Sequence, residues 1–188
     1  MAHLSLLSKL REVSVIAASS VAEARAVIEQ QMPKVVILDM QLPDGTGLDV
    51  VAALEVRGAQ SVLIVVSAHL EHFRPEIHPS ERIHLLSKPA PMRELRQIVE
   101  RVAQATELPG PFSVTDYVQL AGMGLHSVTI ECVDPKVGAR GEIVMHKGEP
   151  WSAQDEQGVG VPAFNRLVTT AGTHVRVVSD KQVLGPRN

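Results

Sequence analysis

The sequence lacks the features that mark secreted, membrane or nucleic-acid-binding proteins. It contains one cysteine, Cys132, so no internal disulfide can form. It has no run of about 18 apolar residues and no basic segment followed by an apolar one, as a secretory signal would have. The formal charge of −3 at pH 7 gives no basic excess for nucleic-acid binding. We therefore expect a cytoplasmic protein that binds neither membranes nor nucleic acid.

Apolar residues, by contrast, are plentiful. Hydrophobic residues make up 45% of the 188-residue chain, which supports a sizeable core and fits one large domain or two small ones. The sequence pattern changes after a short segment rich in proline and glycine, T-E-L-P-G-P. We expect a first domain over residues 1–106, a linker over 107–111 and a second domain over 112–188.

In the first part of the chain, apolar runs alternate with segments of helical periodicity. The runs predict strands over 13–17, 35–38, 61–67 and 83–89, and the periodic segments predict helices over 1–12, 21–30, 47–56 and 92–105. We expect a polar helix or loop over residues 69–80, and Ser20 with Glu23 has the spacing of a capping box. This alternation predicts βαβ units and a parallel sheet.

One run ends in a carboxylate. Val35–Leu38 is apolar throughout, which is typical of a strand buried on both faces, and Asp39 follows it directly. In open α/β sheets, ligands bind at the carboxyl ends of the strands, where Asp39 is expected to lie. The alternative interpretation is that Asp39 only begins a turn or caps a helix.

Two further strand ends carry polar groups, Ser67 and Lys88. Parallel strands would bring these groups and Asp39 to one edge of the sheet. The carboxylate is a nucleophile, the hydroxyl can donate to a phosphoryl oxygen, and the ammonium can stabilise developing negative charge. Each residue alone has a simpler structural explanation. Together they favour a site for a phosphoryl group.

The motifs around these residues resemble the receiver domain of bacterial two-component response regulators, over residues 1–105. They are V-V-I-L-D-M-Q-L-P-D-G-T-G, S-A after V-L-I-V-V, and K-P after I-H-L-L-S. The resemblance implies a flavodoxin-like, doubly wound α/β fold with strand order 2-1-3-4-5. It also implies that Asp39 is the phosphoryl acceptor, Ser67 the switch hydroxyl and Lys88 the phosphate-binding lysine. A cis bond would precede Pro89, and Mg²⁺ would contact Asp39 and the backbone carbonyl of Gln41.

The sequence departs from this family at two places. The family's first strand and the acidic pair at its end are not found before Glu12, so both the sheet and the Mg²⁺ site would be incomplete. Either the chain is a piece or mis-started version of a longer protein, which we prefer, or the remaining strands close together. Leu85 stands where receivers often carry an aromatic residue, so we expect no output coupling through an aromatic flip.

A phosphatase of the haloacid dehalogenase type is the rival interpretation. Those enzymes resemble the pattern hhhhDxDGT, with a second aspartate two residues after the first. Gln41 occupies that position here, and Asp44-Gly45-Thr46 comes too late. The spacing therefore excludes this interpretation, and we expect no enzyme.

The second part of the chain has a different organisation. Its periodicities predict the order α-β-β-β-α-β, which is typical of an antiparallel sheet with packed helices in a smaller α+β domain. A capping box at Ser113–Asp116 and a Lys147-Gly148 hairpin turn are expected. The segments G-E-I-V-M-H-K-G-E-P-W-S-A and P-A-F-N-R-L resemble the PATAN-type domain. We find no nucleophile–base pair and no metal-ligand spacing in this part.

Together these expectations describe a response regulator in a phosphorelay. A histidine kinase would phosphorylate Asp39, and the second domain would signal by binding an output protein that the sequence does not identify; a homodimer is compatible with this. The alternative is a pseudo-receiver that acts as a scaffold without being phosphorylated.

Overall fold

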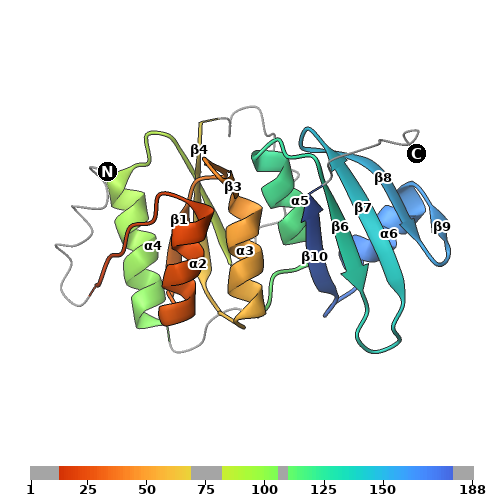
Figure 1. The fold of residues 1–188 in the computed structure, drawn as a ribbon, viewed down its shortest axis with the longest axis horizontal. Coiled ribbons are helices and arrows are strands. Elements are labelled where there is room, and N and C mark those ends of the chain that lie inside the picture. Colours follow the sequence, from red (N-terminus) through yellow and green to blue (C-terminus); the bar gives the residue numbers. More distant parts are fainter. Residues whose placement is uncertain (1–12, 69–81, 106–109, 180–188) are drawn as a thin grey trace. The chain divides into compact units, whose positions relative to one another are not determined.

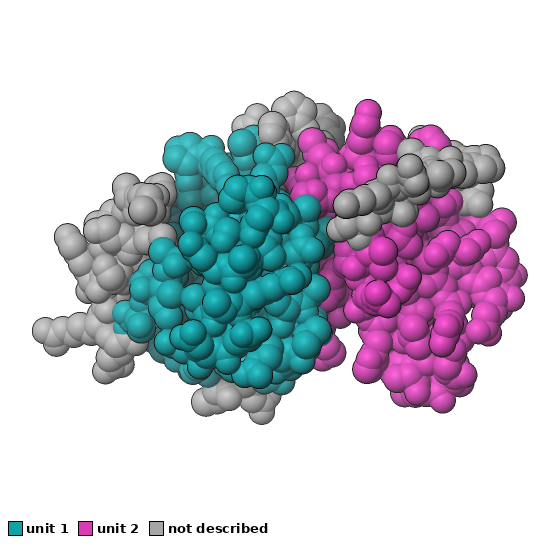
Figure 2. All heavy atoms as spheres, in the orientation of Figure 1, with its two compact units in different colours: residues 1–70, 81–109 teal, residues 71–80, 110–188 magenta. Residues whose placement is uncertain are grey.

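The computed structural model describes residues 13–68, 82–105 and 110–179. The chain divides into two compact units, one of residues 1–70 with 81–109 and one of residues 71–80 with 110–188 (Figure 2). The helix expected over 1–12, the polar segment 69–80 and most of the linker lie outside the described residues. Each unit is presented separately below.

A three-stranded parallel sheet forms the centre of the first unit (Figure 1). Its strands are β1 (Val35–Leu38), β4 (Val62–Ser67) and β5 (Ile83–Ser87), in the order β1-β4-β5. The register pairs Leu38 with Val65 and Ser67 with Ser87, so the three carboxyl ends lie at one edge. The prediction of a parallel sheet is confirmed.

Three helices accompany this sheet: α2 (Val21–Gln30), α3 (Gly47–Val56) and α4 (Met92–Gln104). Their predicted bounds hold to within one residue. The capping box predicted for α2 is half wrong. The Ser20 side chain accepts from the Glu23 N–H as expected, but the Glu23 carboxylate accepts from the N–H and hydroxyl of Ser19 instead.

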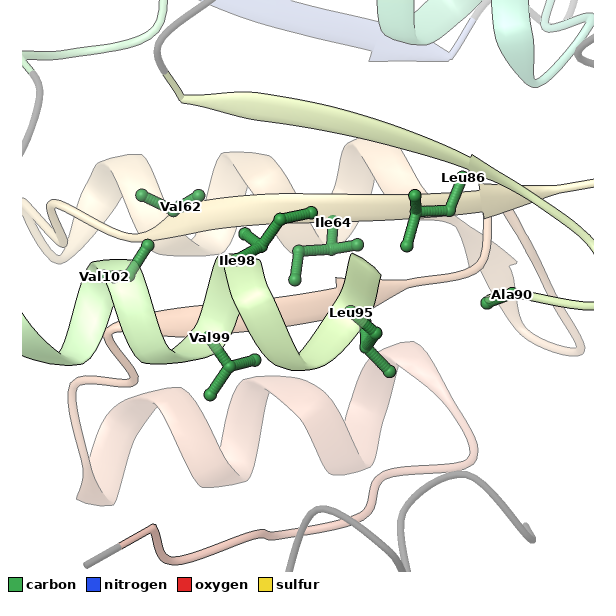
Figure 3. Close-up of a cluster of buried hydrophobic side chains, with 8 residues drawn as sticks. All are labelled: Val62, Ile64, Leu86, Ala90, Leu95, Ile98, Val99 and Val102. Carbon is green, nitrogen blue, oxygen red and sulfur yellow. The ribbon is translucent and has the colours of Figure 1, made fainter. Parts of the chain in front are cut away.

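Apolar side chains from β4, β5, α4 and the segment between β5 and α4 form the cluster shown in Figure 3: Val62, Ile64, Leu86, Ala90, Leu95, Ile98, Val99 and Val102. Full burial of a valine, leucine or isoleucine side chain contributes roughly 1.5–3 kcal/mol. Because side chains alternate along a strand, Leu63 and Val65 point to the opposite face, where both are also fully buried. β4 is therefore covered on both faces.

The edge strand β1 corrects two expectations. Val35, Val36 and Ile37 are only half-buried, so the prediction of a strand buried on both faces is wrong for most of β1. The strand predicted over 13–17 is also absent, and residues 13–18 run without strand pairing. A groove of about 520 Å³ lies between the two segments. No strand of the described residues fills it, and without a paired neighbour no β-ladder can form.

An antiparallel sheet dominates the second unit, with the order β10-β6-β7-β8-β9. Two helices complete the part of this unit that the structure describes, as predicted from the sequence. The elements are α5 (Val114–Met123), β6 (Val128–Val133), β7 (Arg140–His146), β8 (Glu149–Asp155), β9 (Gly158–Val159), α6 (Val161–Thr169) and β10 (His174–Ser179). The short β9 is an addition to the predicted order.

The capping box and the hairpin turn predicted for this unit are confirmed. Ser113 and Asp116 form the predicted capping box at the start of α5. Lys147 and Gly148 make the β7–β8 turn with φ angles of 49° and 84°, which is why glycine suits the second position.

No helix among the described residues combines the length and the apolar character needed to cross a membrane.

Candidate functional site

A carboxylate and an ammonium meet at the carboxyl edge of the parallel sheet. Asp39 follows β1 and Lys88 follows β5. The Lys88 Nζ lies 2.5 Å from Asp39 Oδ2, although 49 residues separate them in sequence. Both side chains are 44% exposed, so a partner in solution can reach them. The fold therefore brings two of the three predicted polar side chains into direct contact.

Ser67 is the last residue of the central strand β4 and is buried. Its backbone carbonyl accepts a hydrogen bond from the Lys88 N–H at 2.9 Å. Because β4 lies between β1 and β5, the Ser67 side chain belongs to the same edge as Asp39 and Lys88. The peptide bond between Lys88 and Pro89 is cis.

The turn after Asp39 is a small hairpin of β2 (Gln41–Leu42) and β3 (Gly45–Thr46). The Gln41 N–H donates to Asp39 Oδ1 at 3.2 Å, and the Gly47 N–H donates to the Met40 carbonyl at 3.1 Å. Met40 is buried against Gly47, where an added Cβ would lie 2.7 Å from the Met40 sulfur. These contacts fix the backbone that carries the carboxylate.

The end of this turn is also the start of α3. The Thr46 N–H and hydroxyl both donate to Asp49 Oδ2, at 2.8 and 2.9 Å, within a capping box. This box is not among the features predicted from the sequence, although the Thr-x-x-Asp spacing is a usable signal for it. The carboxylate of Asp44 accepts from two N–H groups of α2, so it caps a helix rather than joining Asp39 as a second acid.

The arrangement suits the binding of an anionic group. An exposed ion pair contributes only about 0–1 kcal/mol, so Lys88 can leave the carboxylate and bind an incoming anion at little cost. The compact lysine ammonium then remains within reach of whatever Asp39 binds. The Asp39 carboxylate itself is accessible enough to react.

The residues at this edge do not make a metal site on their own. Mg²⁺ prefers six oxygen ligands in octahedral geometry. One carboxylate, Asp39, is present here, and one of its oxygens is bound to Lys88. Within residues 13–68, 82–105 and 110–179 no group of three or more His, Cys, Asp or Glu side chains could hold a metal ion. The described residues therefore do not fit Mg²⁺, with or without the Gln41 carbonyl.

Reactive groups in the second unit have structural explanations. Burial raises the pKa of the Cys132 thiol to about 12, so it is not a nucleophile at neutral pH. Arg166 donates two hydrogen bonds to Asp155, at 2.7 and 2.8 Å, and these bonds are the main reason that the pKa of Asp155 falls to about 2. His146 packs edge-on against Trp151 in the β7–β8 hairpin. His146 Nδ1 also lies 3.4 Å from the Ser127 hydroxyl, which accepts a hydrogen bond from the Lys147 N–H at 3.0 Å, so this contact has a structural role at the β7–β8 turn.

Comparison with known protein families identifies a match that covers more than half of the chain. The sequence model of the response regulator receiver domain matches residues 2–100. No curated protein matches the chain.

Several solved receiver domains are similar to this chain at low sequence identity. The Francisella response regulator 1452 receiver domain is 18% identical, with a TM-score of 0.44 over 56% of this chain and 88% of that one. The receiver domain of NtrX from Brucella abortus is 19% identical, with a TM-score of 0.46 over 56% and 89%. The PhyR receiver domain from Erythrobacter litoralis is 20% identical, with a TM-score of 0.40 over 52% and 73%.

Proposed function

The chain belongs to the response regulator receiver domain family, and on this premise we propose that Asp39 accepts a phosphoryl group from a histidine kinase. The observation that supports this most is the contact between the exposed carboxylate of Asp39 and the Lys88 ammonium at the carboxyl edge of the sheet. The family is a signalling one, and the proposal makes this chain a response regulator rather than an enzyme.

In the proposed reaction an oxygen of Asp39 attacks the phosphorus atom of the donor. A bond forms between that oxygen and phosphorus, the bond from phosphorus to the donor breaks, and the donor leaves with the electron pair. Lys88 exchanges its contact with the carboxylate for one with the phosphoryl oxygens and offsets their charge. The Ser67 hydroxyl donates to another phosphoryl oxygen, guided by the backbone bond between Ser67 and Lys88.

The second unit would deliver the output. We propose that residues 112–188 form a PATAN-type domain, joined through residues 107–111 to a receiver domain of residues 1–106. Acidic side chains outnumber basic ones over residues 110–179, which favours a protein partner over nucleic acid. The proposal places this signalling in the cytoplasm, where a kinase could reach Asp39, and is compatible with a homodimer.

A pseudo-receiver that is never phosphorylated is the second candidate. Its support is the single carboxylate at the edge of the sheet, since the described residues give Mg²⁺ too few ligands. Such a protein would act as a scaffold through its surfaces alone.

One experiment separates the two candidates. The full chain is incubated with acetyl phosphate in a buffer that contains Mg²⁺, and its intact mass is measured. A response regulator gains the mass of one phosphate, and Asp39→Asn abolishes this gain. Glu100→Gln, which removes an exposed carboxylate paired with Arg96 on α4, is the matched control and keeps the gain. An unchanged mass in the wild-type chain supports the scaffold instead.

A further inference from the structure

The turn after Asp39 is tied to a helix that begins some twenty residues earlier in the chain. The Val21 N–H donates to Asp44 Oδ1 at 2.7 Å, and the Ala22 N–H donates to Asp44 Oδ2 at 3.0 Å. These are the first two N–H groups of α2, which have no acceptor within the helix itself. The third, from Glu23, donates to the Ser20 hydroxyl at 3.1 Å. The helix thus has one local cap and one cap from the Asp39 turn.

These two hydrogen bonds between Asp44 and α2 matter more to the stability of the turn than to that of the helix. The hairpin that carries Asp44 has only two residue pairs, Gln41 with Thr46 and Leu42 with Gly45, and an isolated two-stranded hairpin is marginally stable. Asp44 attaches its tip to the end of a ten-residue helix. The approach is close, because a Cβ at Gly45 would lie 3.0 Å from a methyl carbon of Val21.

Electrostatics keep this tie in place. A carboxylate at a helix N-terminus is stabilised by the partial positive charge there. The hydrogen bonds from Val21 and Ala22 hold the pKa of Asp44 below its usual range. The carboxylate therefore stays ionised, and able to accept both bonds, at neutral pH.

We infer that Asp44 is a positioning residue for Asp39: by anchoring the β2–β3 turn to the start of α2, it fixes the backbone from which the Asp39 carboxylate projects. The link between them runs through Gln41, whose N–H donates to Asp39 Oδ1 at 3.2 Å and whose partner in the hairpin is Thr46. The inference rests on the proposed function, in which Asp39 is the reacting group. Asp44 itself touches no reactant.

The test compares two variants of the full chain that remove different caps of the same helix. Asp44→Ala removes the tie to the turn, and the control Ser20→Ala removes only the local cap. Urea unfolding measures the stability of each. The rate and the concentration dependence of phosphate uptake from acetyl phosphate are followed by intact mass, and the amide chemical shift of Gln41 by NMR.

We expect Asp44→Ala to slow maximal uptake about tenfold or more, since small displacements of a reacting group carry large costs in rate. Ser20→Ala should slow it less than about twofold at a similar loss of stability. Asp44→Asn keeps one acceptor oxygen and should restore part of the rate. It also replaces Asp44→Ala if that variant does not fold. The Gln41 amide shift should move in the Asp44 variants and stay in place in Ser20→Ala.

Equal slowing by Asp44→Ala and Ser20→Ala would overturn the inference, because it would show a purely structural role. An unmoved Gln41 amide in Asp44→Ala would overturn it as well. If the wild-type chain takes up no phosphate, the proposed function fails, and the Gln41 shift still decides whether Asp44 positions the turn.

Discussion

At the amino end of the parallel sheet Arg82 binds Glu55, whereas at the carboxyl end Lys88 binds Asp39. The Arg82 side chain is 3% exposed and also donates to two backbone carbonyls, those of Ser61 and Ala59, at 3.1 and 3.0 Å. Lys88 and Asp39 are each 44% exposed.

The difference separates a buried ion pair that stabilises the fold from an exposed ion pair within the same sheet. A buried cation with its donors satisfied by fixed carbonyls cannot leave without a large loss, because its partners would remain desolvated. An exposed pair exchanges readily with water or with a phosphoryl group. The amino end is therefore fixed by buried contacts, and the ion pair at the carboxyl end remains accessible to solvent.

The largest effect is expected at the amino end. Arg82→Ala removes a buried cation from Glu55 and from two carbonyls, and should lower the free energy of unfolding by about 3 kcal/mol. Urea unfolding followed by circular dichroism measures this. Arg96→Ala, which breaks the exposed pair with Glu100 on α4, is the control and should cost at most about 0.5 kcal/mol. Equal losses of unfolding free energy in Arg82→Ala and Arg96→Ala would contradict the distinction between the buried and the exposed ion pair.

A smaller loss is expected from Ser61→Ala, at the same end. The Ser61 hydroxyl is fully buried and donates to the Pro33 carbonyl at 2.6 Å, joining the start of β4 to the segment before β1. Leaving that carbonyl unpaired should lower the free energy of unfolding by about 1–2 kcal/mol. Thermal unfolding measures this loss. A gain in stability would contradict the conclusion that the hydrogen bond between Ser61 and Pro33 stabilises the fold.

At the carboxyl end, Lys88→Ala should change the free energy of unfolding by about 1 kcal/mol or less. The change should shrink further as salt is raised, because salt screens exposed charges. The same variant should nevertheless lose most of its phosphate uptake. A destabilisation as large as that of Arg82→Ala would show that Lys88 holds the fold together.

The smallest effect concerns acid. The pKa of Asp44 is lowered, so its contribution to stability is complete above the ordinary carboxyl pKa of about 3.9 and is lost as the pH falls through the lowered value. Asp44→Asn lacks this contribution. The difference in unfolding midpoint between the wild-type chain and Asp44→Asn should therefore narrow as the pH is lowered from about 6 to 3. A constant difference would show that the charge of Asp44 contributes nothing.

The sequence predicted the residues at the strand ends better than the contacts made with backbone groups. Asp39 and Lys88 are visible in the sequence because each interrupts an apolar run at the end of a strand. Arg82 and Asp44 are not, because their partners are mainly backbone groups 21 to 23 residues away, which leave no pattern in side-chain type. Contacts of this kind emerge only when the chain is folded.

The edge strand shows a second limit. The apolar run Val35–Leu38 correctly predicted a strand in a parallel sheet. The apolar composition of this run shows that the strand can be buried. The half-exposure of Val35, Val36 and Ile37 depends instead on which elements pack beside the strand. Likewise, residues 13–17 have the composition of a strand but no paired neighbour among the residues described.

The most direct test of the account locates the phosphate. After incubation with acetyl phosphate and Mg²⁺, the full chain is digested and the peptides are fragmented in a mass spectrometer. The account predicts one added phosphate on Asp39 in the wild-type chain and in Glu100→Gln, a strong reduction in Lys88→Ala, and none in Asp39→Asn. A phosphate on another residue, or none in the wild-type chain, would contradict it.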